Sequence, residues 1–377
     1  MTKAKSRFAV LIIAAALLLP RPVLAVDTSA AAHMLMEVST GRVLDCKNED
    51  ARLPMASTTK ILTGLLTAER CDMDEVVTVE PEAAGVEGTS MYLKAGETLT
   101  VRDLLYGLMI SSGNDAAVML AIHMGGTVEN FCTMMNERAR ELGAENSNFA
   151  SPNGLPNEAH YTTAADLARI ACAAMKNGIF RKVVGTQSID LPADADSPAR
   201  HLRSKNKILY QYDGGTGVKT GFTKAAGKCL VASAKRDGME LVAVVLNDYT
   251  MFPDCISLLD HGFANWKLRS VASDGTPMGD IKVKNGVADS VGTKAVGDLL
   301  LPLTDEEVTM INSSVNTRSS IAAPVAEGEK TGDIVYRIGA NELGRQSVVT
   351  TGAVSENTYR YNIDRVLRRW LVIQGEN

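Results

Sequence analysis

The hydrophobic pattern divides the first part of the chain into strand-like, helical and again strand-like stretches. Residues 33–38 and 42–46 flank a Ser39-Thr40-Gly41 turn and predict a β-hairpin. From about residue 57 to residue 180, apolar positions recur with helical spacing. Three strand-like runs and a helical segment follow, at 217–222, 229–235, 240–247 and 253–267. Because strands enclose a helical block, we expect one antiparallel sheet, completed by both ends of a domain and covered by helices.

Two helices within the block have recognisable start signals. Thr100-x-x-Asp103 has the form of a capping box, in which each side chain bonds to the other residue's backbone N–H. Thr163-x-x-Asp166 opens a further helix, and Gly178 is placed to close it. The sequence therefore predicts separate helices over 57–180 and not one continuous helix.

The composition changes near Ser273. Short β-like runs separated by Gly, Pro and Asp predict a small all-β domain over 273–355. The runs are 281–283, 307–311, 333–338 and 346–350. At the end of the chain, 356–377 combines apolar and arginine residues with helical spacing. This pattern predicts an amphipathic helix that lies either on a membrane surface or against the β domain.

The first 25 residues are organised like a secretory signal. Lys3, Lys5 and Arg7 precede an apolar run of twelve residues, and a small-residue cleavage site ends at Ala25. The apolar run is too short to span a bilayer comfortably. We therefore expect residues 1–25 to be removed from an exported protein whose first folded domain covers 26–272.

Composition argues against several classes of protein. Of the 377 residues, 45% are hydrophobic and 22% charged, which indicates a globular chain. Lys and Arg total 39 against 44 Asp and Glu, without a basic block, so nucleic-acid binding is not expected. The six cysteines form no Cys-x-x-Cys pair, and we expect mostly free buried thiols, with a disulfide set as the alternative. The five histidines lack metal-ligand spacing, so no metal is expected.

Three short motifs occur in order: Ser57-Thr58-Thr59-Lys60, Ser112-Gly113-Asn114 and Lys219-Thr220-Gly221. None is specific alone, since Ser204-x-x-Lys207 and Lys330-Thr331-Gly332 repeat two of the patterns. Context separates them. The first motif opens an apolar helix, where a spacing of three puts both side chains on one face. The second lies in a link between helices, where functional loops are common, and the third lies on a strand-like run.

This set of motifs resembles the penicillin-binding serine acyl-transferases, and more narrowly the low-molecular-mass D-alanyl-D-alanine carboxypeptidases of the S11 peptidase family. The resemblance covers about 30–268 and continues through the β domain, where 323–330 is similar to the family's second domain. It implies a mixed α/β (α+β) fold of the penicillin-binding and β-lactamase type, with no cofactor. It also implies peptidoglycan stem peptides as substrates, β-lactams as acylating inhibitors, and a location at the outer face of the bacterial membrane or in the cell wall.

Acyl transfer explains why the first motif pairs a serine with a lysine. The Ser57 hydroxyl is a weak nucleophile and must lose its proton to an adjacent base. Lys60 can be that base if its amine is neutral, and burial and the like charge of Lys219 both lower its pKa. The helix N-terminus adds a field that favours negative charge on Ser57.

The resemblance assigns the remaining roles. Ser112 relays the proton to the leaving amine, and Asn114 binds the substrate's peptide group. The backbone N–H groups of Ser57 and Phe222 form the oxyanion hole. The third motif and its neighbour bind the substrate and its terminal carboxylate, at Lys219, Thr220, Gly221 and Phe222. Phe222 stands where many members have histidine, and Lys205 is a candidate for the position where relatives have an arginine near the substrate.

Two alternatives remain open at this point. A class A β-lactamase shares the three motifs but needs a glutamate for deacylation, and no glutamate between 115 and 215 begins a Glu-x-x-x-Asn pattern. A catalytically silent wall-binding or scaffold protein could keep the same fold. The intact Ser57, Lys60 and Lys219 argue against the silent protein.

Overall fold

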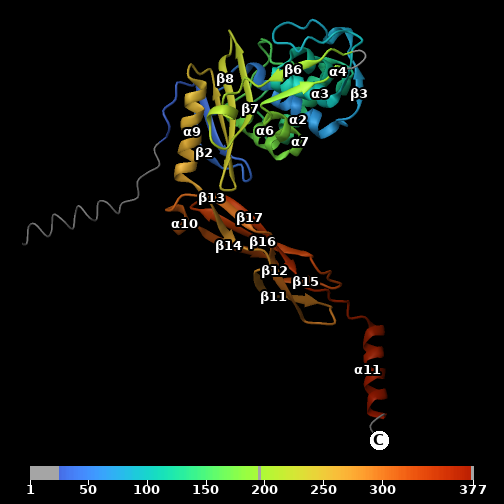
Figure 1. Cartoon of the computed structure of the whole chain (residues 1–377). Coiled ribbons are helices and arrows are strands. Elements are labelled where there is room, and N and C mark those ends of the chain that lie inside the picture. The colour runs from blue at the N-terminus through green and yellow to red at the C-terminus, as the bar shows by residue number, and fades with distance from the viewer. Residues whose placement is uncertain (1–24, 194–196, 375–377) are drawn as a thin grey trace, which may run out of the picture. The chain divides into compact units, whose positions relative to one another are not determined.

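The computed structural model describes residues 25–193 and 197–374 (Figure 1). Positions 1–24 of the predicted signal therefore lie outside the described residues. The chain divides into two units between Trp266 and Lys267, and each is described by itself below.

An antiparallel sheet forms the centre of the first unit. Its spatial order is β2 (Val43–Lys47), β1 (Ala32–Glu37), β9 (Met239–Leu246), β8 (Gly227–Arg236) and β7 (Gly215–Thr223). The predicted hairpin is β1 and β2, and β1 pairs with β9 from the far end of the unit, Ala32 opposite Leu246. Every residue of β1 and β9 is buried, and β9 is accordingly apolar at all positions except Glu240. The prediction of one sheet completed by both ends of the domain is confirmed.

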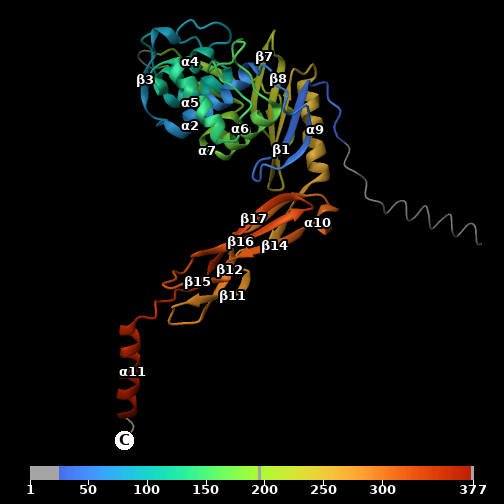
Figure 2. The ribbon, with the colours of Figure 1, turned by 180° about the vertical axis from the view of Figure 1, so that it is seen from behind.

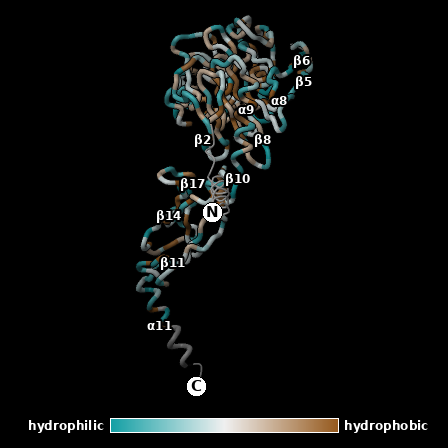
Figure 3. Tube along the Cα trace, turned by 90° about the vertical axis from the view of Figure 1, so that its left-hand side faces the viewer, coloured by the Kyte–Doolittle hydropathy of each residue, from teal (hydrophilic) through white to brown (hydrophobic). Residues whose placement is uncertain are grey.

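Helices cover both faces of this sheet (Figures 1 and 2). One face contacts α9 (Met251–Asn265), and the other contacts α6 (Ala164–Lys176) from the helical block. The rest of the block consists of α2 (Lys60–Arg70), α3 (Val101–Tyr106), η3 (Gly107–Ser111), α4 (Asn114–Gly125), α5 (Val128–Glu141) and α7 (Gly178–Val184). A continuous apolar core joins these helices to the sheet. Figure 3 shows the hydrophobic residues of this unit, coloured brown, concentrated in its interior.

Short elements that the sequence did not predict complete the unit. They are η1 (Ala56–Thr59), β3 (Val76–Thr78), η2 (Pro81–Ala83), β4 (Thr98–Thr100), β5 (Ser188–Leu191), β6 (Arg200–Arg203) and α8 (Ile208–Gln211). β3 pairs with β4, and β5 pairs with β6. Each is only three or four residues long, which is too short for a periodic hydrophobic signal.

The helix starts agree with their sequence signals, but one predicted end does not. Thr100 and Asp103 form the predicted reciprocal capping box. Gly178 does not close α6, which already ends at Lys176. The Asn177 side chain caps the next helix instead, so Gly178 is the first residue of α7. The prediction was wrong because asparagine is a strong N-cap and sets the start of a new helix here.

The second unit is built mainly from strands. Its larger sheet has the order β14 (Asn312–Thr317), β16 (Lys330–Ile338), β17 (Asn341–Thr350), β12 (Ser290–Val296), β11 (Pro277–Lys284) and β15 (Ser320–Ala322). A smaller sheet pairs β10 (Lys267–Ala272) with β13 (Leu299–Leu303). Residues 267–272 therefore belong to this unit, whereas the sequence analysis ended the first domain at 272. Because these residues pair with β13, the second unit begins at Lys267, before the predicted boundary.

Two further segments of the second unit bear on predictions. Residues 307–311, expected as a strand, form mainly the short helix α10 (Glu307–Met310). In the turn that leads into it, Glu307 N donates to Thr304 Oγ1 (3.2 Å), and Thr304 N donates to Glu307 Oε2 (3.0 Å). The predicted C-terminal helix is α11 (Tyr359–Gln374). Within the described ranges, no helix combines the length and apolar character needed to cross a bilayer.

Candidate active site

Ser57 lies in η1, a single turn of 3₁₀ helix that continues directly into α2. The preceding residue, Ala56, has a left-handed φ of 48°, which is unusual for a residue other than glycine. Lys60 is the first residue of α2, and its Nζ lies 3.0 Å from Ser57 Oγ in a hydrogen bond. The spacing of three residues therefore brings the hydroxyl and the amine into direct contact.

The Lys60 side chain is completely buried. Besides Ser57, its Nζ contacts Asn114 Oδ1 and Asn153 O, each at 2.7 Å. Burial lowers the pKa of Lys60 well below its usual value, and the charge of Lys219 lowers it further, against the opposing effect of Asp115. A neutral amine can donate to Asn114 and Asn153 while its lone pair accepts the Ser57 proton. The contacts thus suit a lysine that acts as a base.

The second motif connects Lys60 to the start of α4. Asn114 is 4% exposed, and its Oδ1 accepts from Lys60 while its Nδ2 donates to Glu87 O (2.6 Å). Ser112 lies at the junction of η3 and α4 and has a left-handed φ of 62°. Backbone strain of this kind is typical of functional loops, where the surrounding structure holds it in place.

Asp115 holds the loop beside the second motif. It is fully buried and accepts hydrogen bonds from Ser90 Oγ and from the backbone N–H groups of Met91 and Leu93. The sequence analysis missed this role. Asp115 directly follows Asn114, but an acidic residue in the first turn of a helix is ordinary and gave no separate signal.

The third motif lies on β7, an edge strand whose backbone approaches η1. A Cβ atom at Gly221 would lie 3.0 Å from Ser57 N and 3.1 Å from Thr58 N, closer than ordinary contact. Only glycine therefore allows this approach without a shift of the backbone. The Phe222 side chain is 64% exposed.

Lys219 is buried on the same strand, and its Nζ donates to Thr220 O (3.0 Å). Burial, followed by the charge of Lys205, lowers the pKa of Lys219 to about 7. The charge of Lys205 therefore acts on the third motif. Lys205 itself lies outside the helices and strands, in the connection between β6 and α8.

A loop and a histidine that sequence reasoning missed support η1 from the other side. Gly154 has a left-handed φ of 86°, and a Cβ there would lie within 2 Å of Ala56 O. His160 Nδ1 accepts from Ala150 N (3.0 Å), so its Nε2 carries the proton and donates to Thr59 Oγ1 (2.7 Å). Burial and the charge of Lys60 lower the His160 pKa to about 4. His160 is therefore neutral near pH 7 and fixes the turn that carries Ser57.

Comparison with known families agrees with this geometry. A family model described as D-alanyl-D-alanine carboxypeptidase matches residues 20–250. The chain belongs to this family. A second model, described as the C-terminal domain of penicillin-binding protein 5, matches residues 266–356 of the same chain. The family and the fold expected from the three motifs are both confirmed.

Relatives of this carboxypeptidase family extend over nearly the whole chain. D-alanyl-D-alanine carboxypeptidase DacF of Bacillus subtilis is 32% identical over 357 residues, 91% of this chain and 92% of the relative. Penicillin-binding protein 5 of Haemophilus influenzae has a similar solved structure, with a TM-score of 0.75 and 26% identity, covering 88% of this chain and 99% of that one. DacD of Francisella tularensis has a TM-score of 0.67 and 26% identity, covering 91% of this chain and 98% of that one.

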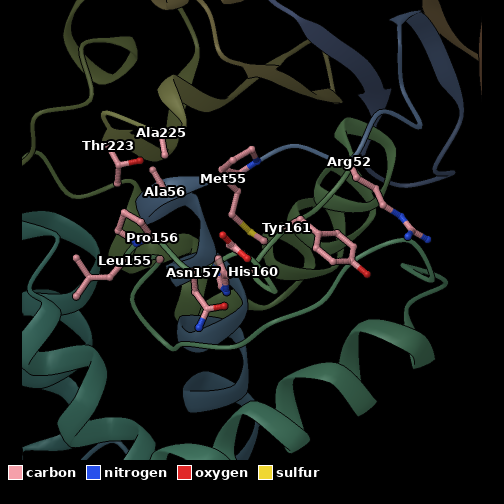
Figure 4. A pocket seen from close by; sticks show the side chains of 13 residues that line it. Arg52, Met55, Ala56, Leu155, Pro156, Asn157, His160, Tyr161, Thr223 and Ala225 are labelled. Atoms are coloured by element: carbon pink, nitrogen blue, oxygen red, sulfur yellow. The ribbon is translucent and has the colours of Figure 1, made fainter.

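A pocket of about 570 Å³ opens beside η1 in this carboxypeptidase unit (Figure 4). Its walls come from residues 52–56, from the loop 154–161, and from Thr223 and Ala225 beyond the third motif. It reaches Ala56, the residue directly before Ser57. The pocket was not foreseen, because its walls come from segments about 100 and 170 residues apart.

Two further expectations from the sequence concern cysteines and metal ions. The six cysteines all fall within the described part of the chain and are free thiols. Cys132, Cys172, Cys229 and Cys255 are buried. Among the described residues, no group of three or more His, Cys, Asp and Glu side chains is arranged to hold a metal ion.

Proposed function

We propose that this chain removes the terminal D-alanine from peptidoglycan stem peptides through an acyl-enzyme on Ser57. The observation that carries the proposal is the 3.0 Å contact between Ser57 Oγ and the buried Lys60 amine. This pairing supplies a nucleophile and a base without histidine. Family membership supplies the reaction class, a D-alanyl-D-alanine carboxypeptidase.

In the acylation step, the Ser57 proton passes to Lys60 Nζ as Oγ bonds to the carbonyl carbon between the two D-alanines. The oxyanion of the tetrahedral intermediate accepts hydrogen bonds from the backbone N–H groups of Ser57 and Phe222. The proton then reaches the leaving nitrogen through Ser112, the C–N bond breaks, and D-alanine departs. Water hydrolyses the ester by the same proton route, which restores Ser57.

Substrate binding explains the second lysine. A peptide carboxylate beside Lys219 favours the protonated amine, which offsets the effect of burial on its pKa. Thr220 and Lys205 add a hydroxyl and a second cation for the same carboxylate. Asn114 Nδ2 donates one hydrogen to Glu87 O, which leaves its second hydrogen for the substrate's peptide group.

β-Lactams acylate the same serine in this proposal, because their strained amide resembles the D-Ala-D-Ala peptide. The test combines labelled penicillin with a D-Ala-D-Ala peptide and measures covalent label, D-alanine release and penicillin turnover. We expect both labelling and D-alanine release, and loss of both in Ser57→Ala. Rapid penicillin hydrolysis without D-alanine release would favour a β-lactamase, and reaction with neither would favour a silent scaffold.

We infer further that the protein acts outside the cytoplasm, beside the membrane. Residues 1–25 serve as an export signal, 26–266 as the carboxypeptidase domain and 267–355 as the β domain. The apolar side chains of Ile363, Val366 and Leu367 on α11 are exposed. Together with the arginines of this helix, they suit a position in the interface of an anionic membrane.

A further inference from the structure

We propose that the carboxypeptidase unit contains a binding site for its own processed N-terminus, in which the ammonium group of Val26 pairs with the buried carboxylate of Asp45. This inference rests on the export signal proposed above, because cleavage after Ala25 makes Val26 the first residue. The site is separate from the Ser57 chemistry: Asp45 belongs to β2, which forms the edge of the sheet opposite to β7.

Residues 26–31, which follow the cleavage position, are fixed to the unit before the first strand begins. Lys47 Nζ on β2 donates to Thr28 O (2.8 Å). Ser29 N donates to Asp254 Oδ2 on α9 (2.7 Å). The helix α9 itself contacts both β1 and β2 (Figure 2). The start of the segment therefore has a defined position, although it forms neither helix nor strand.

Asp45 is a buried carboxylate with few partners. Its side chain is 4% exposed, and among the described residues only Val26 N hydrogen-bonds to it, at 2.7 Å from Oδ2. Two imidazoles lie slightly farther away, with His33 Nε2 3.5 Å from Oδ1 and His261 Nε2 3.7 Å from Oδ2. Burial lowers the pKa of His33, which favours its neutral form. Because a buried carboxylate is stable only when it is paired, Asp45 favours a positive charge at Val26.

Cleavage creates that charge on the atom that already contacts Asp45. Hydrolysis of the Ala25–Val26 peptide bond by a signal-processing endopeptidase consumes one water. The C–N bond breaks, the water oxygen bonds to the Ala25 carbonyl carbon to give a carboxylate, and both water hydrogens end on Val26 N as –NH₃⁺. The hydrogen bond of 2.7 Å thereby gains the attraction of two opposite charges. The uncleaved chain has a neutral amide at Val26 N and lacks this ion pair.

The charged and titratable groups that face this pair come from three elements. They are His33 on β1, Lys47 on β2, and Asp254 and His261 on α9. An opposite charge within about 4–6 Å shifts a pKa by about 1–3. Because Val26 is partly exposed and the like charge of Lys47 opposes the effect, we expect the α-amine pKa to rise by about 1 from its ordinary 7.7–8.0.

The test compares two mature chains, each released from a fusion partner so that the first begins at Val26 and the second carries one glycine before Val26. The glycine moves the ammonium group by up to about 3.6 Å and restores a neutral amide at Val26 N. At pH 7, we expect the unfolding constant from urea titration to be about three- to tenfold smaller for the first chain, since one pKa unit corresponds to about tenfold. The amine pKa is raised by folding, so this difference should be full below about pH 8 and disappear by about pH 10.

Substitutions of two neighbouring acids assign the effect to Asp45. In Asp45→Asn, the two N-termini should give equal unfolding constants. In Asp27→Asn, which removes an exposed acid next to Val26, the difference should persist. NMR titration of the ¹³C-dimethylated α-amine is a second readout that needs no substitution of Asp45, and an ordinary pKa for this amine would overturn the ion pair.

The first residue of the exported protein, read by mass spectrometry, separates this inference from the export signal. We expect Val26, and any other first residue would overturn the site by removing its premise. With Val26 first, equal stability of the two chains, or a difference that survives in Asp45→Asn, would overturn the ion pair and leave the export signal intact. None of these readouts depends on D-alanine release, so failure of the Ser57 chemistry is detected separately.

Discussion

The contact between β7 and η1 can be tested by adding one methyl group. In Gly221→Ala, the new Cβ would lie 3.0 Å from Ser57 N, 3.1 Å from Thr58 N and 3.2 Å from the Cβ of Ala56. Ordinary contacts of a Cβ begin at 3.4 Å. Because two of the three neighbours are backbone atoms, the strand or the turn must shift by a few tenths of an ångström.

The expected effect on acylation follows from what this shift displaces. Ser57 N is one of the two proposed oxyanion donors, and Gly221 directly precedes the residue that supplies the other. Loss of one such donor costs on the order of 10²–10³ in rate, and a displacement of about 1 Å costs about 10². A shift of a few tenths of an ångström should therefore slow acylation by about tenfold. We expect the free energy of unfolding to fall by only about 1–2 kcal/mol, the usual cost of mild overpacking.

The assay is the second-order rate of covalent labelling by a fluorescent penicillin, measured beside urea unfolding. Gly178→Ala is the matched control, because its Cβ would meet no atom within 4 Å and it lies at the first position of α7. The control should label at the wild-type rate and be equally or slightly more stable. If Gly221→Ala folds and labels as fast as the control, then the close approach of β7 does not position the oxyanion donors.

Four further outcomes are expected. Lys60→Ala should abolish penicillin labelling near neutral pH, and near-normal labelling would exclude Lys60 as the base. With a Lys219 pKa of about 7, kcat/KM for the peptide should fall as pH rises above about 7, and a pH profile that stays flat there would contradict carboxylate binding by Lys219. The pKa of His160 is about 4 in the folded chain against an ordinary 6.5, so the unfolded state binds more protons between these pH values. The free energy of unfolding should therefore fall by up to about 3 kcal/mol as pH drops through this window. Urea unfolding of His160→Gln should show a smaller fall. Deletion of residues 359–377 should release the exported protein from membranes, and unchanged partitioning in a vesicle-sedimentation assay would leave α11 without a membrane role.

Local chemistry explains which parts of the site the sequence could predict. Ser57 and Lys60 are three positions apart at a helix start, so helical geometry alone brings their side chains together. The effect of Lys219 on the Lys60 pKa was also foreseen, and it ranks second after burial. The family resemblance supplied what spacing could not, namely that the third motif, some 160 residues later, meets the first.

The residues that escaped prediction act through contacts between distant segments. Asn153 contributes only its backbone oxygen to Lys60, so its side-chain type gave no signal. His160 was considered only as a metal ligand, and its bond to Thr59 depends on a loop whose path has no periodic pattern. The errors at Gly178 and Glu307 have the opposite origin. At Gly178 a glycine suggested the end of a helix, but the Asn177 side chain caps the start of α7. At 307–311 the apolar pattern suggested a strand, but reciprocal bonds between Thr304 and Glu307 form the turn that leads into a short helix.

The turn that carries Ser57 is held from several directions at once, and this accounts for its strained backbone. Thr59 Oγ1 donates to Ala56 O (2.8 Å), and His160 orients that same hydroxyl. Gly154 leaves room for the loop to press against Ala56 O, and Gly221 leaves room for β7 on the other side. A left-handed alanine costs about 1–2 kcal/mol and persists only where its surroundings exclude the relaxed conformation. The same contacts that impose this strain place Oγ of Ser57 beside Lys60 before substrate arrives, so the geometry of the nucleophile does not have to be created during the reaction.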